Sequence, residues 1–431
     1  AAPLAPALDW SDWPGGFLGA AEMCNNNGAC RKADPGVMCP SFRATGRERD
    51  LTRGRANSLR LALSGQLGPD ALVSDDMART MELCVGCKGC RRECPTGVDM
   101  ARMKIEFLHQ YKARRGLTLR DRLVSSLPHY APWLAAFAPL LNAAERAAPL
   151  RALRERATGF SRRRQLPAWR RDRFRPTDAG GAAGGEREAV LFADCFNTAF
   201  EPENARAGVA VLEAAGFRVR HPRGADGTRP PCCGRSWLAA GRIDRARAEM
   251  QRTVAMLLPY AEAGTPIVGL EPSCLFTFRD ELQAVLPGPE SARVGESTVM
   301  LESLVSEGEA AERLAQRLEP LPEERAVVHA HCHRKSFDGP AALMAALSMV
   351  PGLKPELVES SCCGMAGSFG YEAEHYEVSM KMAEASLLPA VRAAGKDALI
   401  AADGTSCRHQ IADGAGRTAQ HPARILERAL A

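Results

Sequence analysis

Two kinds of hydrophobic pattern divide the 431-residue chain. In the second half, short apolar runs rich in β-branched residues predict buried strands. Stretches with apolar residues at helical spacing lie between these runs, at 203–217 and 377–395. The predicted strands cover residues 189–194, 266–270, 327–331 and 398–403. Strands that alternate with helices in this way predict α/β units with a parallel sheet.

The first 120 residues predict short helices and loops instead. An apolar stretch without charged residues follows at 123–144, and by length alone it could span a bilayer. Pro128, Pro132 and Pro139 interrupt it, however, and proline inside a helix costs about 3 kcal/mol. We therefore expect broken helices that pack on protein or lie at an interface, rather than a membrane-spanning helix.

An arginine-rich segment comes next. Ten arginines lie between Arg151 and Arg175, opposed only by Glu155 and Asp172. The main interpretation is a solvated helical face, and the alternative is a docking surface for an acidic partner or anionic lipid headgroups. The run lacks the interleaved aromatic residues of a single-stranded nucleic-acid platform, so no nucleic-acid partner is expected. The Gly/Ala-rich stretch at 176–188 is typical of a linker.

Three cysteine features recur in the same order in the second half, at spacings of about 130 to 137 residues. Each copy has a cysteine after a strand, then an adjacent Cys-Cys-Gly, then a cysteine after a later strand. The first copy holds Cys195, Cys232, Cys233 and Cys274, and the second holds Cys332, Cys362, Cys363 and Cys407. Three matching features at one period predict a duplicated domain.

The cysteine content changes this picture more than the overall composition does. The hydrophobic fraction of 45% and the charged fraction of 25% are ordinary globular values, and a net charge of +5 is too small to imply a polyanionic partner. The chain has 15 cysteines, many of them in tight groups. No secretory signal pattern precedes them, and a chain of this length can fold without disulfides, so the groups indicate metal ligation. Because the first residue is not Met, we expect a processed chain or a piece of a longer polypeptide.

The densest group, CVGCKGCRRECP at 84–95, has the spacing C-x2-C-x2-C-x3-C-P. In two-cluster ferredoxins, three such thiolates bind one iron–sulfur cluster and the fourth, before proline, binds the neighbouring cluster. Gly86 and Gly89 permit the tight loop that brings backbone close to the sulfides. Zinc is the alternative, but zinc sites usually use paired C-x2-C knuckles with a longer spacer.

The fourth ligand of this cluster must come from another segment, and Cys39 shares the Cys-Pro context. The expected ligands of one [4Fe–4S] cluster are Cys39, Cys84, Cys87 and Cys90. By reciprocity, Cys94 is expected to serve another cluster together with Cys24 and Cys30. Asn27 stands where a complete motif would have a cysteine. A three-iron cluster, a four-iron cluster with a non-cysteine ligand and an empty site all fit this second set.

Each repeat offers four thiols at strand ends, where an α/β sheet gathers its ligands. Vicinal cysteines are too close to form an ordinary disulfide with each other, and Gly234 and Gly364 allow backbone to approach a bulky cofactor. We therefore expect one metal site in each repeat, built from its four cysteines. His331, His333 and His409 are candidates for tuning the second site, and ordinary core or surface positions are the alternative for each.

The fused pattern of CNNNGACRK, MCPSFRAT, TRGRANSLRLAL, CVGCKGCRRECPTGVDM and two CCG repeats resembles a known family. It is similar to the iron–sulfur half of FAD-linked D-2-hydroxy-acid dehydrogenases, which include respiratory D-lactate and D-2-hydroxyglutarate dehydrogenases. The CCG repeats are also similar to those of heterodisulfide reductase and of the iron–sulfur subunits of glycolate oxidase and anaerobic glycerol-3-phosphate dehydrogenase. The resemblance implies an α+β multidomain fold, in which a helical two-cluster ferredoxin-like domain precedes two duplicated α/β CCG units. The expected domains are 1–122 (ferredoxin-like), 123–188 (apolar helices, arginines and linker), 189–300 (first CCG unit) and 301–431 (second CCG unit).

Two features depart from this resemblance. In heterodisulfide reductase the last CCG element is C-x2-C, and five cysteines bind a non-cubane cluster, whereas Glu271 and Gly404 occupy the earlier position here. This difference argues against that cluster and against disulfide reduction. Family members also carry FAD in an upstream domain, and here no G-x-G-x-x-G follows a predicted strand. FAD and the catalytic residues are therefore expected in a partner or an upstream domain.

The expected function is that of an oxidoreductase component, which takes electrons from an FAD reduced by a D-2-hydroxy acid and passes them to a quinone or another respiratory acceptor. The expected cofactors are a [4Fe–4S] cluster at the Cys39 set, a second [4Fe–4S] or [3Fe–4S] cluster, and one cluster at each CCG unit. A glycolate oxidase or glycerol-3-phosphate dehydrogenase subunit is the alternative within this class, and a zinc-stabilised interaction scaffold is the alternative outside it. The expected location is cytoplasmic, with peripheral contact at the inner face of a membrane.

Overall fold

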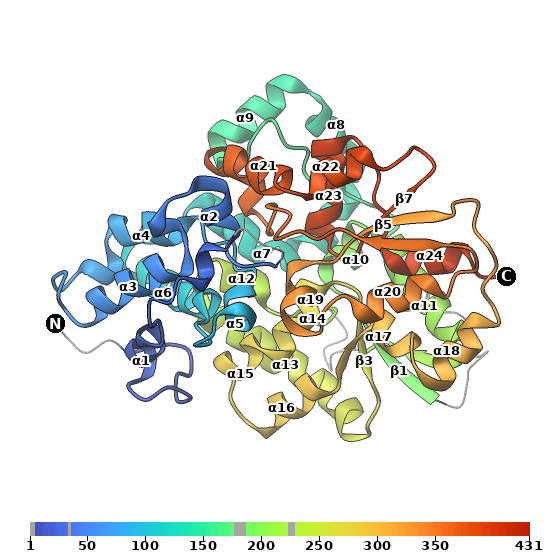
Figure 1. Cartoon of the computed structure of the whole chain (residues 1–431), viewed down its shortest axis with the longest axis horizontal. Helices are drawn as coiled ribbons and strands as arrows, with labels where there is room; N and C mark the ends of the chain where they lie inside the picture. Colours follow the sequence, from blue (N-terminus) through green and yellow to red (C-terminus); the bar gives the residue numbers. More distant parts are fainter. Residues whose placement is uncertain (1–4, 33–35, 176–186, 223–228) are drawn as a thin grey trace.

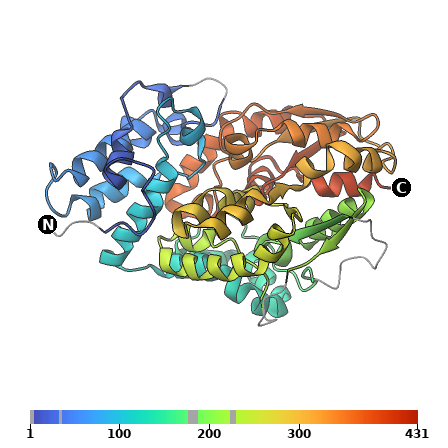
Figure 2. The same cartoon turned by 90° about the horizontal axis from the view of Figure 1, so that it is seen from below.

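The computed structural model describes residues 5–32, 36–175, 187–222 and 229–431, which include all 15 cysteines. Most of the expected Gly/Ala linker, residues 176–186, lies outside the described residues. The N-terminal region lies at one end of the molecule, and the rest of the chain forms the larger body beside it (Figures 1 and 2).

Short helices joined by turns build the N-terminal region. Local capping explains several boundaries: Ser74 Oγ accepts a hydrogen bond from the Met77 N–H at the start of α4, and the Asp99 carboxylate accepts one from the Arg102 N–H at the start of α6. The elements are α1 (Gly16–Glu22), η1 (Ala29–Arg31), α2 (Pro40–Thr45), η2 (Glu48–Asp50), α3 (Thr52–Leu63), η3 (Ala71–Val73), α4 (Asp75–Glu82), α5 (Gly89–Glu93) and α6 (Met100–Arg115).

The apolar stretch forms α7 (Leu119–Leu134), η4 (Ala135–Phe137) and α8 (Ala138–Arg146). Pro128 and Pro132 lie inside α7, so the expectation that they break the helix is wrong. The helical geometry changes only at η4, and Pro139 lies in the first turn of α8, where a missing N–H donor is harmless. Among the described residues, no helix is long and apolar enough to cross a bilayer.

The arginine-rich segment is helical only at its start. Helix α9 (Ala148–Thr158) ends at Gly159, whose φ of 76° is a left-handed cap. Arg164, further along, is fully buried and donates hydrogen bonds to Gly370 O and Ser379 Oγ, each at 2.9 Å. The prediction that the arginine-rich segment forms one solvated helical face is therefore wrong for the part around Arg164, which packs against the C-terminal region.

From residue 187 onward the chain forms two parallel sheets with helices between the strands, as the alternating pattern predicted. The first sheet has the order β2-β1-β3-β4, with β1 (Arg187–Phe192), β2 (Phe217–Arg220), β3 (Ile267–Gly269) and β4 (Thr298–Met300). The second has the order β6-β5-β7, with β5 (Arg325–His329), β6 (Lys354–Leu357) and β7 (Leu399–Ala402). The order β2-β1-β3 matches β6-β5-β7, which agrees with duplication of one unit.

Helices connect and cover these strands. Those of the first unit are α10 (Cys195–Ala199), α11 (Pro202–Ala214), α12 (Arg235–Ala239), α13 (Ile243–Glu262), α14 (Pro272–Arg279), α15 (Glu281–Val285) and α16 (Pro289–Glu296), and α17 (Leu301–Val305) and α18 (Gly308–Ala315) lie between β4 and β5. Those of the second are α19 (Cys332–Phe337), α20 (Ala341–Ser348), η6 (Phe369–Tyr371), η7 (Ala373–His375), α21 (Tyr376–Glu384), α22 (Leu387–Ala393), α23 (Thr405–Ala415) and α24 (Pro422–Arg428).

The two CCG units share one hydrophobic core. A single buried cluster contains Leu191 of β1, Val268 of β3, Val328 of β5 and Ala401 of β7, and α11 packs against α24 across the boundary. A separate buried cluster joins the N-terminal loop around Cys87 to the thiols of the second unit. The fold thus brings cysteines from three parts of the sequence into one interior.

Candidate metal centres

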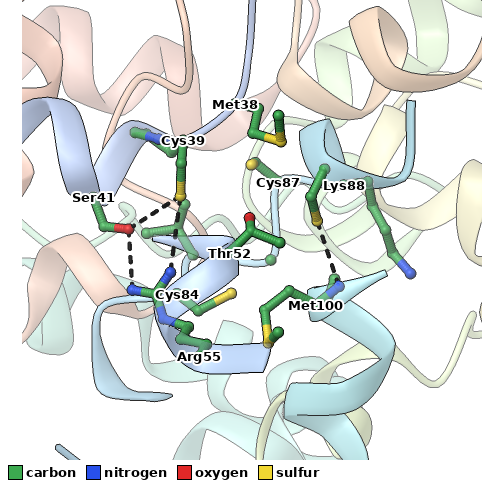
Figure 3. Close-up of a pocket in the computed structure, with 14 residues that line it drawn as sticks. Met38, Cys39, Ser41, Thr52, Arg55, Cys84, Cys87, Lys88 and Met100 are labelled. Carbon is green, nitrogen blue, oxygen red and sulfur yellow. Dashed lines mark hydrogen bonds between the residues drawn. The ribbon is translucent and has the colours of Figure 1, made fainter. Parts of the chain in front are cut away.

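Four thiols line one small pocket in the N-terminal region. Figure 3 shows the sulfur atoms of Cys39, Cys84 and Cys87 facing a common space, and Cys90 also lines it. Cys39 comes just before α2, whereas the other three come from the loop between α4 and α5 and the start of α5. The expected fourth ligand from a distant segment therefore lies where the sequence placed it, and all four thiols are free.

The pocket wall offers hydrogen-bond donors to sulfur. The Met100 N–H donates to Cys90 Sγ at 3.4 Å, and Arg55 Nη1 lies 3.8 Å from Cys39 Sγ. Gly86 and Lys88 have φ values of 60° and 63°, the left-handed conformation that turns successive N–H groups toward a bound anion. Burial raises the pKa of the Cys90 thiol, so a positive centre must replace the proton when this site binds metal. The pocket therefore suits a group that carries iron and sulfide.

Lys88 is a buried cation next to this pocket, with 1% of the residue exposed. Its ammonium contacts the carboxylate of Asp280 and lies 3.5 Å from Asp99 and 3.4 Å from Glu281. Burial alone would lower the pKa of Lys88, but these carboxylates raise it above its ordinary value. The lysine thereby ties the cysteine loop to the first CCG unit, an arrangement that the sequence pattern did not reveal.

The other ferredoxin-type set is less clearly assembled. Cys30 is buried, Cys24 and Cys94 are half-buried, and burial raises the pKa of Cys30. Among the described contacts, none joins Cys94 Sγ to Cys24 or Cys30, and Cys94 Sγ instead lies 3.3 Å from Thr96 Oγ1. Asn27 is exposed, and its Oδ1 accepts a hydrogen bond from the Ala29 N–H at 2.8 Å. The amide at the non-cysteine position is thus engaged in shaping the turn before η1.

The first CCG thiols converge at the carboxyl ends of β1 and β3. Cys195 opens α10 after β1, Cys274 lies in α14 after β3, and the Cys232–Cys233 pair lies just before α12. Cys233 is hydrogen-bonded to both Cys232 and Cys274. The carboxylates of Asp194 and Glu271 lie beside this set, and burial followed by Glu271 raises the pKa of Asp194 to about 6.

The second CCG thiols form the equivalent set. Cys362 is hydrogen-bonded to Cys332 and Cys363, and Cys363 to Cys407. A hydrogen bond from Cys362 lowers the pKa of Cys332 to about 7, and hydrogen bonds from Cys362 and Cys407 lower that of Cys363. The structure therefore brings together the four cysteines of each unit, and their role as cluster ligands stays a prediction.

The surroundings of the two sets differ at matching positions. Around the first set stand Phe192, Asp194, Phe196, Thr198 and Glu271, and around the second stand His329, His331, His333, Lys335 and Gly404. Lys335 Nζ donates to Ser360 O at 2.6 Å and to Ser361 O at 3.3 Å. No carboxylate forms an ion pair with Lys335 among the residues that the structure describes. The first set thus lies beside the carboxylates of Asp194 and Glu271 and the guanidinium of Arg235, whereas the second lies beside the ammonium of Lys335 and the carboxylate of Asp403.

Gly404 explains part of the departure from a C-x2-C element. A Cβ at this position would lie 2.5 Å from His331 Cδ2 and 3.3 Å from Cys407 Sγ. A side chain here would point at the thiol set, but His331 already fills that space. Of the other candidate histidines, His333 Nε2 lies 2.9 Å from Gly86 O, and His409 Nδ1 lies 2.5 Å from Tyr371 Oη. All three lie in hydrogen-bond networks, in which His331 and His333 are buried and His409 is half-buried.

The Cys87 loop joins the ferredoxin pocket to the second CCG set. Ser336 Oγ of α19 donates to Cys87 O at 3.0 Å, and the thiols of Cys87 and Cys332 are close enough that each charge affects the other. Arg235, three residues after Cys232, donates to Glu281 at 2.8 Å and lies 3.2 Å from His333 Nε2. The three thiol sets therefore surround one buried junction.

No group of three or more His, Cys, Asp or Glu side chains in the described ranges closes around a single-ion position. A cubane cluster needs thiols spread around a larger body, as they are around the pocket of Figure 3. The sequence did not predict the cations beside the thiols, because charge alone does not show which lysines and arginines become buried. These cations are Arg55, Lys88, Arg235 and Lys335.

Comparison with known proteins agrees with this arrangement. Residues 20–98 match the profile of the 4Fe-4S dicluster domain, and residues 189–279 and 326–412 both match that of the cysteine-rich domain. This chain is an iron–sulfur protein. The resemblance noted in the sequence, the α+β multidomain fold and the iron–sulfur cofactor class are thereby confirmed.

The relatives are oxidoreductases. The chain is 27% identical to D-2-hydroxyglutarate dehydrogenase of Escherichia coli K12 over 98% of its own length and 44% of that protein. It is 28% identical to one of the subunits of anaerobic glycerol-3-phosphate dehydrogenase of the same organism, over 68% of this chain and 73% of the relative. It is 24% identical to the glycolate oxidase iron–sulfur subunit of that organism, over 91% of both chains. The iron–sulfur protein is thus an oxidoreductase component, and it spans less than half the length of the first of these relatives.

Proposed function

We propose that this iron–sulfur protein is the electron-transfer part of an FAD-linked D-2-hydroxy-acid dehydrogenase, with D-lactate or D-2-hydroxyglutarate as the substrate of the whole enzyme. Electrons come from a flavin in a partner subunit or an upstream domain, and they leave to a quinone or another respiratory acceptor. Supporting this, relatives that match 98% and 97% of the chain are D-2-hydroxyglutarate dehydrogenases.

The observation that carries the proposal is the buried junction of three thiol sets around the Cys87 loop. Transfer of single electrons requires carriers that are close together and shielded from water. The Ser336–Cys87 hydrogen bond and the shared hydrophobic cluster place the ferredoxin pocket directly against the second CCG set. A protein that used its cysteines only to hold separate structural ions would not need this convergence.

The proposed ligands follow the thiol sets. A [4Fe–4S] cluster would be held by Cys39, Cys84, Cys87 and Cys90, a [4Fe–4S] or [3Fe–4S] cluster by Cys24, Cys30 and Cys94, and one cluster by each CCG unit: Cys195, Cys232, Cys233 and Cys274, and Cys332, Cys362, Cys363 and Cys407. Such clusters, when bound, supply one-electron acceptance and donation. The chain itself sets their potentials, because hydrogen bonds to sulfur, nearby charge and burial all change the stability of the reduced state.

The two CCG sets have unlike charged surroundings. Lys335 favours an added electron at the second set and Asp403 opposes it, whereas Arg235 favours one at the first set and Asp194 and Glu271 oppose it. We propose that the second set receives electrons from the ferredoxin pocket because the two lie against each other.

The identity of the donor is the finer part of the proposal. Glycolate oxidase and anaerobic glycerol-3-phosphate dehydrogenase remain the second candidate, because one subunit of each matches 91% and 68% of this chain, respectively. Steady-state reduction of a quinone analogue by the holoenzyme, with D-lactate, D-2-hydroxyglutarate, glycolate and glycerol 3-phosphate in turn, distinguishes them. Turnover with glycolate or glycerol 3-phosphate alone would refute the D-2-hydroxy-acid assignment.

Metal content tests the electron-transfer role itself. Anaerobically purified protein should be brown, contain iron and acid-labile sulfide in similar amounts, and give EPR signals on reduction. Cys39→Ser should remove the signal of one [4Fe–4S] cluster and leave those of the CCG units. A colourless protein that contains zinc would establish the scaffold alternative instead.

A further inference from the structure

Helices α7, α8 and α9 carry an unusual concentration of exposed apolar side chains. The described residues include nine large hydrophobic side chains that are clearly exposed, and five of them lie within 21 consecutive positions. These five are Trp133 (79% exposed), Phe137 (58%), Leu140 (70%), Leu150 (47%) and Leu153 (62%). We call these residues the apolar face. Contiguous exposed apolar patches of this kind usually mark an interaction site.

Helical spacing groups these side chains within each stretch of helix. Trp133, Phe137 and Leu140 follow one another at intervals of three and four residues through the end of α7, η4 and α8, and Leu150 and Leu153 are three apart on α9. Small exposed residues, Ala136 and Ala143, fill the gaps. Helices α8 and α9 pack against each other and lie at the outer edge of the molecule (Figure 1). The apolar face is therefore accessible.

The charge around the face is one-sided. From Trp133 to Arg171 the only acidic residues are Glu145 and Glu155, and both are half-buried. Glu145 forms an ion pair with Arg154, and Glu155 forms one with Arg162. Arg146 and Arg156 are exposed, and among the described residues neither has an ion-pair partner. A helix that combines Trp, Phe and Leu on one side with unpaired arginines beside them is suited to the headgroup region of an anionic bilayer.

We propose that the apolar face is an in-plane membrane-docking surface, which inserts Trp133, Phe137, Leu140, Leu150 and Leu153 into the headgroup region of an anionic bilayer while Arg146 and Arg156 contact lipid phosphates. The surface is separate from the thiol sets, so the proposal does not depend on the electron-transfer role. Its consequence for that role is that an acceptor dissolved in the bilayer would lie next to the protein.

Vesicle flotation tests the docking surface. The probes are vesicles of phosphatidylcholine alone and of phosphatidylcholine with roughly one-third phosphatidylglycerol, at low and high salt. The expected result is binding to the anionic vesicles, weakened by salt, with a blue shift of tryptophan emission that is lost in Trp133→Phe. Removing one arginine charge with Arg146→Gln or Arg156→Gln should weaken binding about fivefold.

A triple variant and a matched control locate the contact. Phe137→Ser with Leu140→Ser and Leu153→Ser should abolish vesicle binding while leaving the circular dichroism spectrum and the iron content unchanged. Leu67→Ser replaces a leucine that is 55% exposed on another surface, and it should bind like the unaltered protein.

Four results would overturn the proposal. The first two are no binding to anionic vesicles at low salt and equal binding by the triple variant. The third is a dimer of the unaltered chain that the triple variant dissociates, which would assign the face to a second copy of this chain. Loss of vesicle binding when the flavoprotein partner is present would likewise assign the face to that partner.

Discussion

Replacement of Lys88 by methionine should destabilise the junction between the ferredoxin-like region and the first CCG unit. The ammonium is buried among Asp99, Asp280 and Glu281, and methionine fills a similar volume without the charge. Removing one partner of a buried ion pair typically costs about 3 to 5 kcal/mol, because the remaining charge stays desolvated.

The contacts of the three carboxylates refine this value. Asp280 keeps an ion pair with Arg91, Glu281 keeps one with Arg235 at 2.8 Å, and Asp99 keeps the Arg102 N–H at 3.0 Å. None is left without a partner, so we expect a loss near the lower end, about 3 kcal/mol. An exposed pair provides the comparison: Arg325 and Glu356 are each 52% exposed, and Arg325→Met should cost no more than about 1 kcal/mol.

Thermal unfolding under anaerobic conditions measures the difference. At about 2 to 4 °C per kcal/mol, Lys88→Met should lower the unfolding midpoint of the affected region by roughly 6 °C or more. Because Lys88 adjoins Cys87, iron content must be compared, and Asp280→Asn offers an independent perturbation from the other side of the contact. The double variant should lose less than the sum of the single losses. A midpoint for Lys88→Met equal to that of Arg325→Met, or strictly additive losses, would refute the reasoning.

Three further predictions concern the second CCG unit. Lys335→Gln should lower the midpoint potential of the cluster in the second set in an EPR-monitored redox titration, because it removes a nearby positive charge. Lys396→Gln removes an exposed lysine and should leave that potential unchanged. A potential in Lys335→Gln equal to that of the unaltered protein would refute the effect assigned to Lys335. Gly364→Ala should lower the free energy of unfolding by about 2 kcal/mol or more and lower the sulfide content, because φ is 83° and the new Cβ would lie 2.4 Å from Ser379 O. In the control Gly308→Ala the new Cβ meets no atom within 4 Å, so the loss in the same thermal unfolding experiments should be smaller. Burial alone would lower the pKa of His375, but hydrogen bonds to Glu372 and Glu82 outweigh burial and raise that pKa above 6.5. The stabilisation that protonated His375 contributes is therefore complete below about pH 6.5 and is lost as pH rises through the raised pKa. Over this range, the unfolding midpoint of His375→Gln should fall less than that of the unaltered protein.

Cysteine spacing was sufficient to predict most of the site, because a cluster motif is a local constraint on the chain. The loop from Cys84 to Cys94 predicted its own cofactor, and the recurring order of cysteines in the second half predicted which four thiols meet in each unit. The strands β1, β3, β5 and β7 were predictable for a related reason: most of their residues are buried, and the buried ones are apolar apart from His329.

The strands β2 and β6 were not predictable in this way. β2 and β6 lie at the edges of their sheets and contain Arg218, Arg220, Lys354 and Glu356, so their sequences lack a continuous apolar run. The prediction that prolines break α7 was wrong because it considered only local sequence. A local rule says that proline ends a helix, but contacts with α10 and α12 hold α7 together through Pro128 and Pro132.

The sequence by itself determined the duplication and the iron–sulfur class, since each depends on residues that are close together or that repeat at one period. Only the tertiary structure decided that the ferredoxin pocket abuts the second CCG set, that Lys88 is buried among three carboxylates, and that an apolar face stays exposed on α7, α8 and α9. The physical reason is that burial and charge compensation depend on which distant segments meet, and no local pattern of residues contains that information.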